Sequence, residues 1–280
     1  MHLHLKSKRR LPAGFTLIEL LVVGATMAVL AGMLLPALAK SRTQSHATTC
    51  LNNEAQLAHA WHLYVEDNNG TLVRTAGEDS LVSVVSPTKK YPLNQWCMGT
   101  MGQFRVATNR QLIMDSLLYK YVGSLGPYKC PADKSGWVKG LLKPQGDGLI
   151  PSLRSISMNC WLNPINAWSS DSQKVTSFRR ITGVLKPSAT WVTIDENPTF
   201  IDDGWFVCDP AVPNWIDLPA SYHDQGSSLS FADGHVEIRH WRDPTVLEGN
   251  LMSGGTPKDG KVDINWLTAR CTYGPTGPTQ

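Results

Sequence analysis

Three residues in the C-terminal part of the chain have types and spacing that could do chemistry. His223 is separated by nine residues from the sequence Asp233-Gly234-His235. Two imidazoles and a carboxylate can hold a metal ion or act as a general acid and base. Asp-Gly is also a common tight-turn sequence, which accounts for Asp233 and Gly234 without catalysis. We prefer the turn, and we expect no catalytic residue and no enzyme activity.

Acidic side chains form a second candidate site. They occur at Asp195-Glu196, Asp202-Asp203, Asp209, Asp224, Asp259 and Asp263. Carboxylate oxygens are calcium ligands, but no EF-hand loop is present. We therefore expect solvated turns and no cofactor, with calcium as the alternative.

Tryptophan is frequent, with 10 residues in the chain. Six of them lie in loop-like sequence: Trp96, Trp137, Trp161, Trp168, Trp205 and Trp215. Exposed tryptophans could form a glycan-binding surface, but large aromatic side chains also fill loop-rich cores. We prefer the core.

The elements that position these residues are short. Beyond Gly70, glycine, proline and asparagine recur every few residues. One helix is expected at 109–122, followed by a loop rich in glycine and lysine. Strands are expected at 152–158, 190–194, 204–207, 227–231 and 235–241. The last two flank Asp233-Gly234 and predict a hairpin, so we expect an antiparallel sheet.

The N-terminal part is different. Residues 15–39 are apolar, and Glu19 is their only charged residue. Such a helix is ~36 Å long, enough for a hydrocarbon core of about 30 Å. The preceding basic cluster places the N-terminus in the cytoplasm. A signal anchor and a signal peptide cleaved after Ala37-Leu38-Ala39 are two explanations, but neither accounts for Glu19.

The helix is expected to continue through residues 40–67, which contain neither glycine nor proline. Apolar positions recur there every three or four residues, which predicts one buried stripe. Asn68-Asn69-Gly70 should end the helix in a left-handed turn, and Pro36 should kink it or locally unwind it.

The sequence around Gly14 resembles a known signature. Gly14 followed by FTLIELLVV, with Glu19 and Pro36, resembles type IV prepilins and type II secretion pseudopilins. The resemblance implies cleavage between Gly14 and Phe15 by a prepilin peptidase, with methylation of Phe15. It also implies that Glu19 pairs with the terminal ammonium of a neighbouring pilin or pseudopilin subunit. An inner-membrane assembly platform and membrane lipid would be the other partners.

Three further motifs are similar to those of a large group of prepilin-like proteins. They are Cys50 to Gly70, Cys130 to Asp133, and His223 to Val236, which contains the His-x9-Asp-Gly element. That group has no assigned chemistry, so the role of His223, Asp233 and Gly234 stays open. Major pseudopilins bind calcium near the C-terminus, and residues 259–266 are distantly similar to that loop.

The expected fold is therefore α+β and pilin-like, with a long N-terminal helix packed on a C-terminal antiparallel sheet domain. We divide the chain into a leader (1–14), a transmembrane and assembly helix (15–39), its soluble continuation (40–67) and a globular domain (68–280). The expected location is the inner membrane, with a periplasmic domain that could enter a filament.

Charge and cysteine content agree with this arrangement. Four of the 26 basic side chains lie in the first ten residues, which leaves 22 against 23 acidic ones. No basic surface remains to bind nucleic acid. The 6 cysteines are widely spaced, without a CxxC pair. They suit disulfides in an oxidising compartment, with the pairing open.

Overall fold

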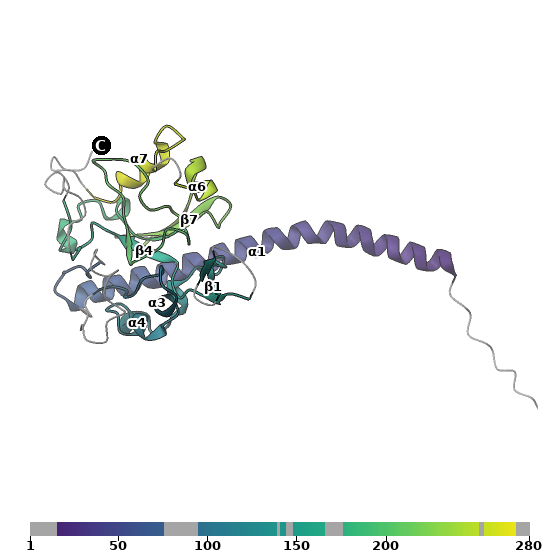
Figure 1. The fold of residues 1–280 in the computed structure, drawn as a ribbon, viewed down its shortest axis with the longest axis horizontal. Coiled ribbons are helices and arrows are strands. Elements are labelled where there is room, and N and C mark those ends of the chain that lie inside the picture. Colours follow the sequence, from purple (N-terminus) through teal and green to yellow (C-terminus); the bar gives the residue numbers. More distant parts are fainter. Residues whose placement is uncertain are drawn as a thin grey trace, which may run out of the picture. The chain divides into compact units, whose positions relative to one another are not determined.

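The computed structural model describes residues 16–75, 95–138, 141–143, 148–165, 176–251 and 255–272 (Figure 1). It divides the chain into two units, Met1–Arg42 and Thr43–Gln280. Helix α1 (Leu17–Asp67) is 51 residues long and contains Pro36. The prediction of one long helix is therefore confirmed.

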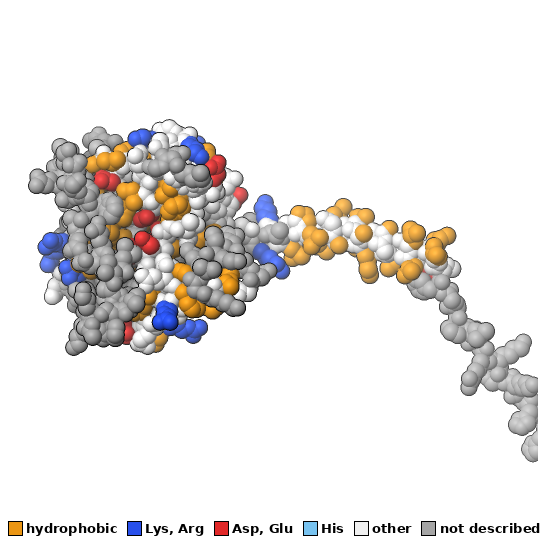
Figure 2. All heavy atoms as spheres, in the orientation of Figure 1, with side chains coloured by type: hydrophobic (Ala, Val, Ile, Leu, Met, Phe, Trp, Pro, Cys, Tyr) orange, Lys and Arg blue, Asp and Glu red, His pale blue; other side chains and the backbone are white. Residues whose placement is uncertain are grey.

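The first part of α1 is apolar and exposed. Hydrophobic side chains cover this part of the helix (Figure 2); Leu17, Leu30 and Leu35 are 78%, 60% and 66% exposed. By length and composition α1 could cross a membrane, a property that it shares with signal sequences.

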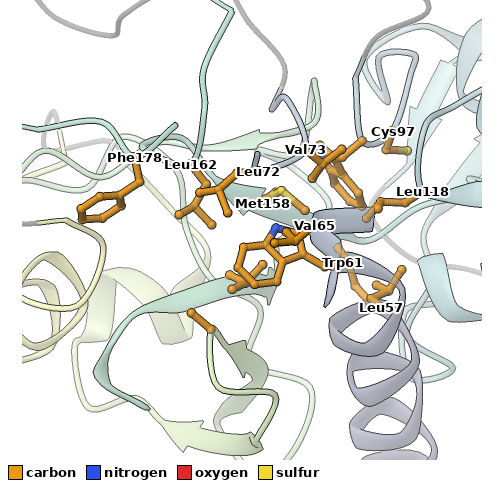
Figure 3. Close-up of a cluster of buried hydrophobic side chains, with 14 of the residues drawn as sticks. Leu57, Trp61, Val65, Leu72, Val73, Cys97, Leu118, Met158, Leu162 and Phe178 are labelled. Atoms are coloured by element: carbon orange, nitrogen blue, oxygen red, sulfur yellow. The ribbon is translucent and has the colours of Figure 1, made fainter. Parts of the chain in front are cut away.

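The second part of α1 carries the predicted stripe. Cys50, Glu54, Leu57, Trp61 and Val65 recur at helical spacing, and all are buried. Trp61 and Val65 point into a hydrophobic cluster that also contains side chains of the loops and of strand β4 (Ile156–Asn159) (Figure 3). Docking on this core, rather than helix propensity, stabilises this half of the helix.

The helix ends as predicted. Asn69 and Gly70 have positive φ angles of 54° and 77°. The Gly70 N–H donates to the Val65 carbonyl at 2.8 Å, which satisfies one of the last carbonyls of the helix.

The expected helix at 109–122 is interrupted. It forms α4 (Arg110–Met114) and α5 (Tyr119–Val122). Between them, the Ser116 hydroxyl accepts from the Met98 N–H at 2.7 Å, and the Leu117 N–H donates to the Gln95 carbonyl at 2.9 Å. The Leu117 N–H is thereby diverted from the bond that it would make within a continuous helix.

The main sheet has five strands, in the order β6-β4-β5-β7-β8. They are β4 (Ile156–Asn159), β5 (Trp191–Asp195), β6 (Trp205–Phe206), β7 (Gly226–Phe231) and β8 (Val236–His240). Each of the five overlaps one of the predicted ranges, and β7 and β8 form the expected hairpin.

The sheet is antiparallel, as expected, except at one edge, where β6 runs parallel to β4, with Met158 opposite Trp205. The connection from β5 to β6 crosses β4, and the direction of the chain reverses between β5 and β6. Since β4 and β6 both run opposite to β5, they run in the same direction.

A second sheet lies where a loop was expected. It consists of β1 (Gly136–Val138), β2 (Leu141–Lys143) and β3 (Ile150–Pro151), in the order β2-β1-β3. Strands of two or three residues are too short to show a period in the sequence. Gly136 permits the close pairing, because a Cβ there would lie 2.5 Å from the Ile150 carbonyl oxygen.

The remaining elements are short. They are α3 (Phe104–Ala107), α6 (Pro244–Glu248), α7 (Val262–Thr268) and the 3-10 turns η1 (Gly126–Tyr128), η3 (Ile181–Gly183) and η4 (Pro187–Ala189). Helices α6 and α7 contribute to a second hydrophobic cluster, which is built around Trp191, Trp205 and Trp241.

Candidate functional site

The Asp-Gly pair of the C-terminal motif forms a turn. Gly234 has a φ of 94° and donates its N–H to the Phe231 carbonyl at 2.9 Å. Asp233 Oδ1 accepts from the His235 N–H at 3.2 Å and lies 2.6 Å from His235 Nδ1. These contacts link the ends of β7 and β8, as the turn interpretation predicts.

His223 has different partners. It lies before β7, is 2% exposed, and contacts Cys130 and Asp195 through Nε2. The side chains of Asp233 and His235, by contrast, are 37% and 41% exposed and contact each other. A hydrolytic site would require all three residues to converge, and the structure does not bring them together.

His223 instead belongs to a buried cluster that the sequence analysis missed. Its members are Cys50 on α1, Cys130 after η1, Asp195 at the end of β5, and His223. One potential ligand atom of each residue lies within 4.8 Å of those of the other three, and all four residues are buried. Three of the four come from the motifs that carried the family resemblance, one from each motif.

The contacts within this Cys–Cys–Asp–His cluster are close. The Cys50 thiol donates to Asp195 Oδ2 at 2.8 Å. Cys130 Sγ lies 3.2 Å from His223 Nε2, and that nitrogen lies 3.6 Å from Asp195 Oδ2. His223 Nδ1 is buried and has no hydrogen-bond partner among the described residues, so Nε2 is the nitrogen that faces the cluster.

Serine side chains orient the cluster. Ser228 on β7 donates to Asp195 Oδ2 at 2.8 Å and lies 3.0 Å from Cys50 Sγ. Ser155 donates to Asp195 Oδ1 at 3.4 Å, and its hydroxyl accepts from the Cys130 N–H at 2.8 Å. Both carboxylate oxygens of Asp195 thus have hydrogen-bond donors.

A second buried carboxyl lies beside the cluster. Glu54, one turn beyond Cys50 on α1, accepts hydrogen bonds from Thr193 and from Ser228. Burial, followed by the charge of Asp195, raises the pKa of Glu54 well above its usual range. The carboxyl of Glu54 therefore keeps its proton at a pH at which an exposed glutamate has lost it.

Ionisation within the cluster is unequal. Burial lowers the pKa of His223, but hydrogen bonds to Asp195 and Cys130 outweigh it and raise this pKa to about 9. A hydrogen bond from Cys50, assisted by His223, lowers the pKa of Cys130. The same hydrogen bond, followed by burial, raises the pKa of Cys50. Cys130 is therefore the thiol that ionises first.

The expected disulfides are not found, because all six cysteines are buried free thiols. Cys160, Cys208 and Cys271 lie in the second hydrophobic cluster, and Cys271 Sγ lies 3.8 Å from the Cys208 carbonyl oxygen. Cys97 packs in the first cluster. Buried thiols of this kind behave as small hydrophobic side chains.

Three other acidic candidates, Asp209, Asp259 and Asp263, serve local structure. Asp259 accepts from the N–H groups of Val262 and Asp263 at 3.1 and 2.8 Å, at the start of α7. Asp263 is buried and contacts Arg239 at 3.2 Å. Asp209 accepts from the Ala211 N–H at 2.8 Å. These carboxylates are used by turns and by an ion pair.

The tryptophans that were candidates for a glycan-binding surface lie in the core where the structure describes them. Trp96, Trp137, Trp161, Trp205 and Trp215 are at most 4% exposed, and Trp168 lies outside the described residues. The five described side chains therefore belong to the core, as preferred.

At the N-terminus, Gly14 and Phe15 lie outside the described residues. Glu19 lies in the first turn of α1 and forms a capping box with Thr16. The Thr16 N–H and hydroxyl donate to Glu19 Oε2 at 2.9 and 2.8 Å, and the Glu19 N–H donates to the Thr16 hydroxyl at 3.3 Å. Glu19 thus stabilises the start of its own helix.

Comparisons of the chain with protein-family models, with curated proteins and with solved structures found no match.

Proposed function

We propose that this chain is a structural, prepilin-like subunit of a type II secretion pseudopilus or a type IV pilus. A prepilin peptidase would cut between Gly14 and Phe15 and methylate the new terminus. The N-terminus of the precursor would lie in the cytoplasm, and the domain after the apolar helix would lie in the periplasm. The resemblance of residues 14–36 to the prepilin signature is the sequence support for this proposal.

The observation that carries the proposal is the continuity of α1. One helix joins an exposed apolar part to a buried amphipathic part. Its backbone is helical through the Ala37-Leu38-Ala39 pattern. A signal peptidase would therefore have to cut inside a helix that continues into the core of the domain. An assembly helix has no such conflict, because the membrane-length part stays attached to the domain that it carries.

The exposed part of α1 offers a physical route to assembly. An isolated carboxylate in a bilayer costs about 2.5–3.5 kcal/mol at the centre of a helix. The ammonium group of a neighbouring mature terminus would offset part of this cost. Glu19 would then favour a packed bundle of subunits over a lone helix, and close packing of the apolar side chains would supply the remaining attraction.

Mass spectrometry of the N-terminus tests the proposal. The full-length chain is expressed with an active prepilin peptidase and with an inactive one. We expect an N-methylated Phe15 terminus only when the peptidase is active. A Gly14→Leu variant should keep its leader even with the active peptidase. A mature terminus at Lys40, or an intact leader in the presence of the active peptidase, would contradict the proposal.

A membrane-tethered module for glycans or envelope components is the second candidate. Tryptophans exposed in a groove would favour it. The five candidate tryptophans that the structure describes are buried, so no observation at those positions favours this alternative over assembly.

A further inference from the structure

We propose that Cys50, Cys130, Asp195 and His223 bind one zinc-class divalent metal ion, which fastens the soluble half of α1 to the sheet. This inference does not depend on the proposed function. It rests on the geometry, the donor set, the charge and the supporting hydrogen bonds of the cluster.

Three of the six distances between the ligand atoms can be compared with those of a tetrahedral zinc shell, and all six are within 4.8 Å. Zinc bonds of about 2.0 Å to nitrogen or oxygen and about 2.3 Å to sulfur place tetrahedral ligand atoms about 3.3–3.8 Å apart. The Cys130–His223 and His223–Asp195 distances are 3.2 and 3.6 Å, and the Cys50–Asp195 distance is 2.8 Å. Small side-chain movements would bring all four atoms to bonding distance around one centre.

The donor set selects the metal. Two thiolates, one imidazole and one carboxylate suit zinc and related transition ions, whereas calcium and magnesium prefer oxygen ligands alone. Four protein ligands complete a tetrahedral shell, and all four residues are buried. A closed site of this kind is structural, because it leaves no open position for a reacting water molecule.

The charge of the region also favours a cation. The side chain of Asp195 is fully buried. Among the described residues, His223 is the one basic side chain within ion-pair distance of Asp195. The Cys50 thiol donates its one proton to Asp195. A divalent ion would displace the thiol protons of Cys50 and Cys130 and the proton on His223 Nε2, and these protons would pass to the solvent.

The hydrogen bonds around the cluster are those of a supported metal site. Ligands of structural metals are held by a second layer of donors and acceptors. Ser228 and Ser155 hold the two oxygens of Asp195, and Ser155 also fixes the backbone at Cys130. The site therefore has its ligands and their supports in place before the metal binds.

The position of the site gives the metal a role. Cys50 lies in the part of α1 that belongs to the globular unit. Asp195 is the last residue of β5, and His223 precedes the neighbouring strand β7. Cys130 lies in the segment between η1 and β1. One metal ion would cross-link four segments that are far apart in the sequence, and because it binds the folded chain it would stabilise the folded state.

Metal analysis of the full-length, untagged protein in detergent tests this inference. We expect one zinc per chain, and about one in Cys97→Ala, the control variant whose buried thiol lies outside the cluster. Cys130→Ser and His223→Gln should lose the metal. Both variants retain His2 and His4, and these histidines should not bind it in place of the cluster. Ser228→Ala should keep all four ligands but bind zinc about 10–100-fold more weakly.

Cobalt substitution provides a readout that does not depend on a variant folding. Cobalt(II) in the wild-type protein should show the visible bands of a tetrahedral site and a thiolate charge-transfer band. The inference would be overturned if the wild-type protein were purified without bound metal and its mass showed a Cys50–Cys130 disulfide. A cobalt spectrum without a thiolate band, or zinc content unchanged in Cys130→Ser, would also overturn it.

Discussion

Cys130 Sγ lies 3.2 Å from His223 Nε2, although 93 positions separate these residues in the chain. Each belongs to a different short motif, and a third motif supplies Cys50 to the same cluster. The three motifs therefore meet in one place. His223, rather than Asp233, is the member of the His-x9-Asp-Gly element that lies in this cluster, and the Asp-Gly pair supplies a turn.

Removal of the metal should lower the thermal stability of the wild-type protein. A ligand present at ~100 times its dissociation constant stabilises the folded state by about 2.7 kcal/mol. We expect a strong chelator to lower the Tm of the wild type and of Cys97→Ala, and to leave the Tm of His223→Gln unchanged. Scanning calorimetry of the full-length protein measures this. Equal shifts in all three proteins would contradict the prediction.

Substitution of Glu19 should separate helix capping from charge pairing. Glu19→Gln retains a side chain that can complete the capping box with Thr16, but it removes the negative charge. Glu19→Ala removes both. If the charge pairs with a neighbouring terminus, both variants should be cleaved normally and both should assemble poorly, as measured by recovery of filaments or by cross-linking between subunits. Wild-type assembly by Glu19→Gln would show that capping is sufficient.

Gly234→Ala should destabilise the β7–β8 hairpin. The φ of 94° at Gly234 suits glycine, whereas a side chain in a left-handed conformation costs about 1–2 kcal/mol. Space is not the obstacle, since a Cβ there would lie 3.6 Å from His62, an ordinary contact. We expect a loss of about 1–2 kcal/mol in the free energy of unfolding. Gly126→Ala is the control, because a Cβ there meets no atom within 4 Å.

Stability should fall as the pH rises through the range in which Glu196 ionises in the unfolded chain. Burial, followed by the charge of Asp217, raises the pKa of Glu196 well above its usual 4.5. The folded state then keeps a proton that the unfolded chain releases, so the free energy of unfolding falls with rising pH above about 4.5. The slope for one such group is at most about 1.4 kcal/mol per pH unit.

Glu196→Gln should reduce this slope, because the amide does not ionise. Denaturant unfolding at a series of pH values measures the effect. Glu66→Gln, on the exposed face of α1, is the control and should keep the wild-type slope. A Glu196→Gln slope equal to that of the wild type would contradict the prediction.

Much of the secondary structure could be predicted because its causes are local. The stripe through Leu57, Trp61 and Val65 follows the helical period, and Asn69-Gly70 supplies the left-handed ending. The β7–β8 hairpin follows from alternation around Asp233-Gly234. The break at residues 115–118 could not be predicted in this way, because a distant segment takes the hydrogen bonds of Ser116 and Leu117.

The long apolar helix, its lone carboxylate, its buried continuation and the Asp-Gly turn can be predicted from local sequence, because each depends on neighbours a few residues apart. Tertiary structure sets the direction of β6 and forms the second sheet, since both depend on pairing between separate segments. It also decides that Cys50, Cys130, Asp195 and His223 meet. Their spacing follows no local period, and docking of α1 on the sheet brings them together.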